Sequence, residues 1–423
     1  MTREMTGAKM VIQALKDQGV DTIFGYPGGA ALPIYDEIFQ QNDIRHILVR
    51  HEQGAVHAAE GYARSTGKVG VCLVTSGPGA TNTVTGLTDA LLDSIPLLVI
   101  SCQVPTFLIG SDAFQEADTV GITRPCTKHN WLVKDTDKLS STIHEAMHVA
   151  RSGRPGPVLV DIPKDVQFAS GTYEAPKPST SHYKPRLKGD LEEITELVAA
   201  IEKAKRPVFY TGGGVINSGP AASQLLRELV DATGIPVTST LMGLGAYPGS
   251  GKNWIGMLGM HGLYEANMAM HDCDLMINIG ARFDDRITGL ISAFSPNSKK
   301  AHIDIDPSSI NKVIRVDIRI FSCIQQLVRI RRCACVCPWH RHRHRRVHVR
   351  YTSHCCGAFS HRIYALSWLF LENADRLTLL HMAHNHRPHN RKACHDHCTS
   401  DRVRNSTHCR ILTAVEHVNG RGG

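Results

Sequence analysis

The feature that most constrains the fold of this sequence is a repeated alternation of short apolar runs with longer helical patterns between residues 21 and 103. Apolar runs such as "VCLVTSGPG" and "PLLVISCQ" flank stretches such as "ATNTVTGLTDALLDS". Apolar strands separated by helices of this length favour a parallel, doubly wound α/β sheet. Ligands bind at the carboxyl ends of such strands, where this sequence places Gly28, Gly29 and the turn Gly77-Pro78-Gly79.

A second series of the same kind begins with "PVFYTGGGV" and continues through "CDLMINIGARFDD" to "KKAHIDIDP". We therefore predict two α/β domains, at residues 1–168 and 190–317, joined by a polar linker at 169–189. Residues 1–20 are predicted to form an amphipathic helix, with Val11, Ile12, Leu15 and Val20 facing inward. They do not resemble a signal peptide, and no run reaches the roughly 18 apolar residues of a membrane span, so we expect a cytoplasmic protein.

Composition changes abruptly near Asp317. Residues up to Asp317 contain 29 Lys and Arg against 34 Asp and Glu, whereas the last 106 residues contain 18 against 5. Four cysteines lie in the first part and nine in the tail, and the tail has 17 arginines but one lysine. The few scattered cysteines of the first part indicate reduced thiols, not a disulfide framework.

Three interpretations of this tail, residues 318–423, are open. Its "CACVC", "HRHRH" and "CHDHC" runs can offer ligands to Zn²⁺, and its charge suits nucleic-acid phosphates. The spacing is not that of established zinc modules, however, and phosphate attraction gives no reason to exclude lysine. A divergent domain is the second interpretation. A change of reading frame, the third, explains the excess of arginine, cysteine and histidine together, and it is the one we favour.

Three other features point to a cofactor site. Glu52 stands at a strand-to-helix junction, where a partly desolvated carboxyl can exchange a proton, although position alone favours an ordinary helix-capping glutamate. The glycines 212–214 follow a strand and allow close approach of a nucleotide, or simply make a tight turn. Asp304 and Asp306 end a strand, where carboxylates accept hydrogen bonds from ribose hydroxyls or, for Asp306, cap a helix.

Eight motifs occur in one order: "FGYPGGA", "RHEQGA", "TSGPGATN", "DAFQE", "GRPGPVLVDIPKD", "GMLGMHG", "GARFDDR" and "HIDIDP". From about Met5 to Asp317 the chain closely resembles the catalytic subunit of acetohydroxyacid (acetolactate) synthases, which use thiamin diphosphate and also bind FAD. The resemblance implies decarboxylation of pyruvate and condensation with a second pyruvate or 2-ketobutyrate, in the synthesis of branched-chain amino acids. Members of the family form homodimers or tetramers and bind a small regulatory subunit.

The same resemblance assigns roles to individual residues. It implies that Glu52 bonds the aminopyrimidine ring of thiamin diphosphate and promotes loss of the C2 proton, with Gln115 near the reacting carbonyl. The implied contacts to the pyrimidine are Pro27, Gly28, Thr75 and Asn82. Those to the substrates are Phe114, Lys164, Met260 and Arg282. Those to FAD are Arg154, Gly213, His261, Arg282 and Asp304. Judged by residue type alone, Phe114 and Met260 would be core residues, and Lys164 and Arg282 would be solvated surface charges.

The resemblance ends at "VDIRIFSC", and the Gly-Asp-Gly motif that serves Mg²⁺ and the diphosphate in the family does not occur in this sequence. We therefore predict a truncated subunit that offers no metal ligands and is inactive alone. Two alternatives stay open. One is another thiamin-diphosphate decarboxylase or carboligase. The other is a non-catalytic protein whose tail binds metal or, less readily, nucleic acid.

Overall fold

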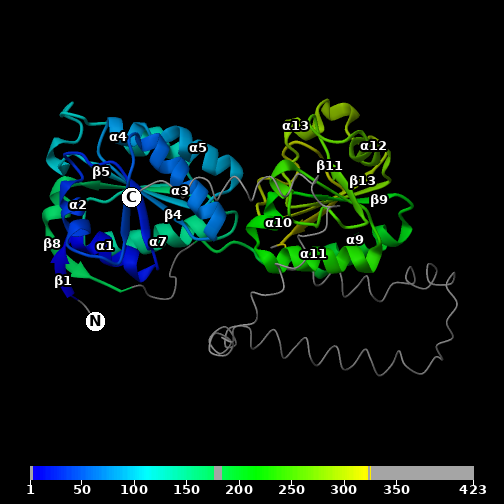
Figure 1. Cartoon of the computed structure of the whole chain (residues 1–423), viewed down its shortest axis with the longest axis horizontal. Helices are drawn as coiled ribbons and strands as arrows, with labels where there is room; N and C mark the ends of the chain where they lie inside the picture. Colours follow the sequence, from blue (N-terminus) through cyan, green and yellow to red (C-terminus); the bar gives the residue numbers. More distant parts are fainter. Residues whose placement is uncertain (1–2, 176–182, 323, 325–423) are drawn as a thin grey trace, which may run out of the picture. The chain divides into compact units, whose positions relative to one another are not determined.

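The computed structural model describes residues 3–175, 183–322 and 324, which contain two separate six-stranded parallel sheets (Figure 1). Helices pack on both faces of each sheet, which confirms the predicted doubly wound α/β class. Nearly all of the tail, and with it the zinc and nucleic-acid interpretations, lies outside the described residues.

The first sheet follows the first series of apolar runs. Its strands are β2 (Thr22–Gly25), β3 (Arg45–Leu48), β4 (Gly70–Val74), β5 (Leu97–Gln103), β6 (His129–Leu132) and β7 (Pro157–Pro163), in the order β3-β2-β4-β5-β7-β6. Every residue of β4, β5 and β7 is buried. Because helices cover both faces of these strands, they are mostly apolar and do not alternate regularly with polar positions.

Alternate residues of each strand supply two cores. Val71 and Leu73 of β4 face one cluster, whereas Cys72 and Val74 face the other. Helices α1 (Gly7–Asp17), α2 (Leu32–Phe39), α7 (Leu139–Arg151) and α8 (Lys164–Phe168) pack on the first cluster, and α3 (Glu52–Thr66) and α5 (Val84–Asp93) on the second. The connecting segments contain α4 (Pro78–Thr81), α6 (Thr119–Thr123) and the 3₁₀ turns η1 (Thr106–Leu108), η2 (Arg124–Cys126) and η3 (Thr136–Lys138).

The predicted helix over residues 1–20 is wrong at both ends. Residues Arg3–Thr6 form strand β1, which pairs antiparallel with β8 (Ser170–Tyr173), and the helix occupies only Gly7–Asp17. Thr6 ends the strand and caps the helix, because its hydroxyl accepts a hydrogen bond from Lys9 N at 3.3 Å. Val11, Ile12 and Leu15 are buried as predicted, whereas Val20 lies beyond the helix and is half-buried.

The second sheet has the strand order β11-β10-β9-β12-β13-β14. Its strands are β9 (Pro207–Thr211), β10 (Val237–Ser239), β11 (Trp254–Met257), β12 (Leu275–Ile279), β13 (Lys299–Asp304) and β14 (Ile318–Phe321). One face is covered by helices α9 (Leu191–Lys203), α10 (Gly213–Asn217) and α11 (Pro220–Thr233), and the other by α12 (Tyr264–Asp272). The loops contain α13 (Asp285–Thr288) and the 3₁₀ turns η4 (Leu241–Gly243) and η5 (Ile291–Ala293). In chain order the strands run 3-2-1-4-5-6, the arrangement of dinucleotide-binding sheets.

Strand β14 lies beyond the range predicted for the second domain. It pairs in parallel with β13 from Ala301↔Ile318 to Asp304↔Phe321, and Ile318 and Ile320 are each 1 % exposed. Buried isoleucines in register with a neighbouring strand belong to the core of this sheet. We therefore propose that the second domain extends to at least Phe321.

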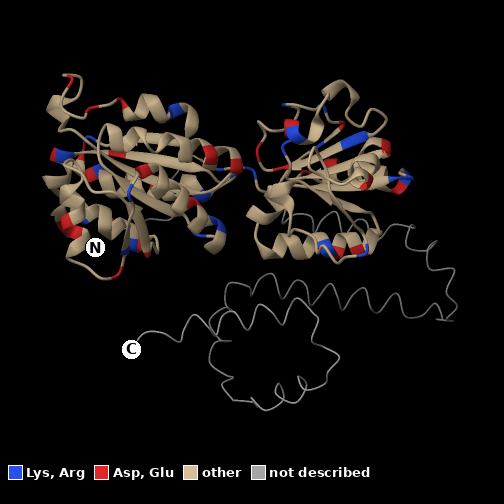
Figure 2. Ribbon diagram, turned by 45° about the horizontal axis from the view of Figure 1, so that its top comes forward, with Lys and Arg blue, Asp and Glu red and all other residues tan. Residues whose placement is uncertain are grey.

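The surface of the described residues carries intermixed charges, and Figure 2 shows lysines and arginines among acidic residues on both sheet units. No helix in the described part of the chain is long and apolar enough to cross a membrane. Cys72, Cys102, Cys126 and Cys273 are all free and buried, as expected for reduced thiols.

Candidate functional site

The first sheet reverses its strand order between β2 and β4, since β3 lies on one side of β2 and the later strands on the other. Loops that leave two such strands diverge and open a crevice at their carboxyl ends. Pro27 and Gly28 follow β2, and Thr75 follows β4. Glu52 begins α3, with three residues between it and the end of β3, so the fold brings together residues that three separate segments supply.

Glu52 is the acidic group of this site. It is 8 % exposed and is the first residue of α3, whose N-cap His51 accepts through Nδ1 from Gln53 N at 3.1 Å. Asn82 Nδ2 donates to Glu52 Oε2 at 2.9 Å, and the helix N-terminus also favours the carboxylate. Among the described residues, Glu52 Oε1 has no hydrogen-bond partner.

Gly28 and Thr75 form the floor of the crevice. The backbone N–H of Ala30 donates to Thr75 Oγ1 at 3.3 Å, and a Cβ added to Gly28 would lie 2.5 Å from Thr75 Cβ. Only glycine therefore fits at Gly28 without displacing Thr75. Gln167 Nε2 holds the same turn by donating to Ala30 O at 3.0 Å and Ile162 O at 2.9 Å.

The segment that carries Gln115 lies against the Gly77 turn. Gly77 has φ +49°, and a Cβ there would lie 2.4 Å from Gln115 O. Glu116 ties the segment together, since its side chain accepts from the backbone N–H groups of Gly110 and Ala113. These contacts, with Gly110 the stronger, lower the pKa of Glu116. Gln115 itself is exposed and has φ +57°.

The second sheet has its own reversal point, between β9 and β12. The turns after these strands are in backbone contact, because a Cβ on Gly212 would lie 2.3 Å from Gly280 O. The tight-turn interpretation therefore fits Gly212, whereas Gly213 is half-buried and its Cβ would lie 3.2 Å from Met242 Cβ. Asp304, at the end of β13, accepts from Asp306 N at 2.9 Å.

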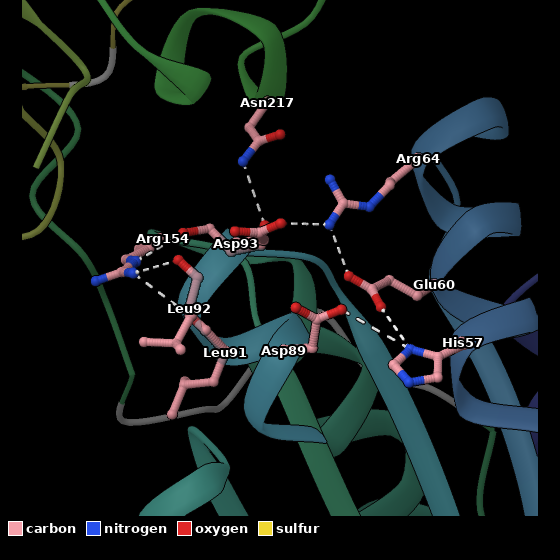
Figure 3. A network of polar contacts seen from close by, with 10 residues as sticks. His57, Glu60, Arg64, Asp89, Leu91, Leu92, Asp93, Arg154 and Asn217 are labelled. Carbon is pink, nitrogen blue, oxygen red and sulfur yellow. Dashed lines mark hydrogen bonds and ion pairs between the residues drawn. The ribbon is translucent and has the colours of Figure 1, made fainter. Parts of the chain in front are cut away.

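The other residues predicted to bind FAD lie in separate segments. Arg282 donates to Asp284 Oδ2 at 2.8 Å, and its side chain is 43 % exposed. His261 is exposed in the loop after β11. Arg154 donates to Ser94 Oγ at 2.7 Å and to the carbonyls of Leu91 and Leu92, as Figure 3 shows in part, and it pairs with Asp306 at 3.1 Å. Both guanidinium groups are therefore paired with a carboxylate, and that of Arg282 is also partly exposed to solvent.

Two family models match the chain. Residues 5–122 match the N-terminal TPP binding domain of thiamine pyrophosphate enzymes, and residues 194–330 match the central domain of the same enzymes. The acetolactate synthase large subunit of Haemophilus influenzae is 51 % identical over 321 residues, which are 75 % of this chain and 56 % of that protein. The isozyme 3 large subunit of Escherichia coli is 50 % identical over 327 residues, 77 % of this chain and 57 % of that protein.

The chain belongs to the acetolactate synthase family of thiamine pyrophosphate enzymes. It spans about half the length of the curated relatives it matches, among them an acetolactate synthase of Mycobacterium bovis, 51 % identical over 327 residues. The resemblance read from the eight motifs is thereby confirmed, and the alternative of a sister decarboxylase loses its support. The N-terminal match covers strands β2 to β5 of the first sheet, and the central match covers all six strands of the second.

The structure brings some of the residues predicted for this acetolactate synthase family site together and leaves others apart. Gly28, Glu52, Thr75 and Asn82 lie close together at the carboxyl end of the first sheet, with Gln115 beside the Gly77 turn. Phe114 and Met260 are 87 % and 62 % exposed, so the alternative that they are core residues is wrong. Lys164 begins α8 at the carboxyl end of β7 and is half-buried.

Sequence reasoning missed a buried acid beneath this crevice. Asp161 of β7 is 1 % exposed and accepts from Ser101 Oγ at 2.6 Å and from Gln103 Nε2 at 3.0 Å. Burial raises the pKa of Asp161 to about 7, against the opposing effect of these two hydrogen bonds. Gln103 Nε2 also donates to Ala117 O at 2.8 Å, which anchors the segment that carries Gln115. An aspartate inside the otherwise apolar "VLVDIP" run was the available signal.

Proposed function

We propose that the described residues form the pyrimidine side of an acetolactate synthase active site. The reaction would be decarboxylation of pyruvate and its condensation with a second pyruvate or with 2-ketobutyrate. The observation that carries the proposal is Glu52, held at the start of a helix by Asn82 and with one carboxylate oxygen that has no hydrogen-bond partner among the described residues. As in the relatives' family, we further propose self-association and a small regulatory partner subunit.

The residues present fit thiamin diphosphate. When bound, this cofactor supplies a nucleophilic carbon and an electron sink. Glu52 Oε1 is placed to accept a hydrogen bond from a protonated ring nitrogen and to hold that proton during exchange. The glycine at position 28 leaves Thr75 as a bare floor on which a flat ring can lie. Pro27, Gly28, Thr75 and Asn82 are the proposed pyrimidine contacts.

FAD is proposed for the carboxyl end of the second sheet. Support comes from the strand order of this sheet, from Gly213 at the reversal point and from Asp304 at the end of β13. We propose that Arg154, Gly213, His261, Arg282 and Asp304 line it. Phe114, Lys164, Met260 and Arg282 are the proposed substrate contacts, where the planar fork of Arg282 suits a keto-acid carboxylate. We assign Mg²⁺ to no residue of this chain, because the sequence has no Gly-Asp-Gly motif.

Replacing Glu52 with glutamine tests the proposal directly. Glutamine keeps the size of the side chain but removes the charge that strengthens its hydrogen bond to a protonated ring. A charge-assisted hydrogen bond contributes about 1.5–3 kcal/mol, so the affinity for thiamin diphosphate is expected to fall by roughly 10- to 100-fold. Titration calorimetry of the full chain measures this. Glu145→Gln, on the exposed face of α7, is the matched control and is expected to bind as the wild type does. Equal affinities for Glu52→Gln and Glu145→Gln would contradict the proposal.

Turnover by the isolated chain is a separate prediction. With thiamin diphosphate, Mg²⁺ and FAD added, we expect no release of carbon dioxide from pyruvate above the protein-free rate. The reason is that Mg²⁺ prefers a set of hard oxygen ligands beside the diphosphate, which the sequence does not supply in the family's form. Radiometric detection of released carbon dioxide is the measurement, and a rate that scales with protein concentration would refute the prediction.

A further inference from the structure

Helices α3 and α5 bring a second group of chemically active side chains together, away from the crevice. His57 and Glu60 lie one turn apart on α3, and Asp89 faces them from α5 (Figure 3). His57 Nδ1 is 3.4 Å from Glu60 Oε2 and 3.8 Å from Asp89 Oδ2, and the three ligand atoms all lie within 4.8 Å of one another. One imidazole nitrogen and two carboxylate oxygens therefore converge on a single point.

The charges around this point do not balance within the protein. Arg64 pairs with Glu60 Oε1 at 2.7 Å and with Asp93 Oδ2 at 2.6 Å, so one guanidinium is shared between two carboxylates. Asp89 adds a third carboxylate, and a neutral His57 adds no charge. The Glu60 side chain is only 5 % exposed, which makes an unbalanced negative charge beside Asp89 costly. A further cation beside Glu60 and Asp89 would reduce this cost.

We propose that His57, Glu60 and Asp89 bind a divalent transition-metal ion, with Zn²⁺ as the best fit. Zinc bonds of about 2.0–2.2 Å place neighbouring ligands of a tetrahedral site about 3.3–3.6 Å apart, which the distances from His57 Nδ1 approach. A mixed nitrogen and oxygen set suits Zn²⁺, whereas Mg²⁺ and Ca²⁺ demand more oxygens. The side chains of His57 and Asp89 are 40 % and 50 % exposed, so water can fill the fourth position.

Such an ion would connect the two helices that also position Glu52. Glu52 is the first residue of α3, and Asn82, which donates to it, directly precedes the segment that enters α5. The ion would thus cross-link α3 and α5 about one and a half to two turns from the Glu52–Asn82 pair. The metal-binding proposal does not depend on the proposed function, because none of its three ligands belongs to the crevice.

The test must separate this site from the nine cysteines of the tail, which can also bind zinc. We would therefore compare full-length chains that share the tail: wild type, His57→Gln, Asp89→Asn and, as control, His271→Gln, an exposed histidine on α12. After chelation and desalting, each is equilibrated at the same buffered free Zn²⁺, and bound zinc is determined by mass spectrometry of the metal. Amide hydrogen exchange of the α3 and α5 peptides, with and without Zn²⁺, locates the effect.

Wild type and His271→Gln are expected to hold one zinc equivalent more than His57→Gln and Asp89→Asn, whose site affinity should fall at least about tenfold. Zinc should slow exchange in α3 and α5 of the first two proteins only. Equal zinc content in all four proteins would overturn the proposal. Zinc-induced protection that persists in His57→Gln would also overturn it. Circular dichroism confirms that both exposed-site variants fold.

Discussion

Replacing Phe209 with alanine is expected to lower the free energy of unfolding of the second sheet by about 3–5 kcal/mol. Phe209 is fully buried on β9, the strand at the reversal point. Its cross-strand neighbours are Val237 on one side and Ile277 on the other, and all three belong to one core cluster. Truncation would remove a ring from a close-packed centre that neighbouring strands cannot collapse to fill.

The lower free energy of unfolding can be measured separately for each sheet, because each sheet unit contains a buried thiol that becomes reactive only on unfolding. Cys273 is 1 % exposed beside the second sheet, whereas Cys102 is fully buried in β5 of the first. Pulsed alkylation across a urea gradient, followed by peptide mass spectrometry, would show a lower midpoint at Cys273 in Phe209→Ala. Phe39→Ala is the control, because Phe39 is 89 % exposed and its loss should cost less than about 0.5 kcal/mol. A Cys273 midpoint shifted no further than in this control would refute the prediction.

The pH dependence of the first sheet should depend on Asp161. Its pKa in the folded chain, about 7, lies above the ordinary value of a free aspartate because burial penalises the charged form. The folded state therefore binds more protons than the unfolded state between about pH 4 and pH 7. The stabilising contribution is complete at low pH and is lost as the pH rises through 7. The loss amounts to at most about 4 kcal/mol, since one pKa unit corresponds to about 1.4 kcal/mol.

Asp161→Asn removes the titrating proton and should flatten this dependence. We expect the urea midpoint at Cys102 to fall from pH 5 to pH 8 in the wild type and to change much less in the variant. Asp137→Asn supplies a matched control on the surface turn η3, where the wild-type slope should persist. If Asp161→Asn and the wild type have parallel pH profiles, the proton is not held at Asp161.

Much of the fold could be predicted from the sequence because most of its central strands are largely apolar runs and its helices lie between them. The order of the strands could not, since short apolar runs do not specify their partners. Residues 3–6 show a second limit. Their "REMT" sequence continues the polar side of a helical pattern, but pairing with residues 170–173, far along the chain, makes them a strand. Tertiary contacts override local preference in this way at chain ends.

The residues of the candidate site were also only partly predictable from the sequence. Glu52 stood out at a strand-to-helix junction, but position alone favoured a helix-capping glutamate, and family resemblance supplied its proposed role. Its partner Asn82, thirty positions away, was assigned by family resemblance and not by residue pattern. Asp161 lay within one of the eight motifs but was given no role, and His57, Glu60 and Asp89 belonged to no motif with a predicted role. A helix places residues three apart on one face, but which other helix faces them depends on the packed sheet.

The reading-frame interpretation of the tail remains a prediction, and the gene itself can test it. Translation past codon 317 in the other two frames should yield a Gly-Asp-Gly followed by an asparagine. The nucleotide sequence is the measurement, and two uninformative frames would count against the interpretation.

Burial of all four described cysteines has one more consequence. It raises the pKa of each thiol, so an oxidant meets protonated sulfur that is also shielded from solvent. Sulfenic or sulfinic acid at Cys72 or Cys102 could therefore arise only while the sheet was open. In a cell extract, the oxidised fraction of Cys72 or Cys102 would therefore report how often the protein had unfolded before the extract was made.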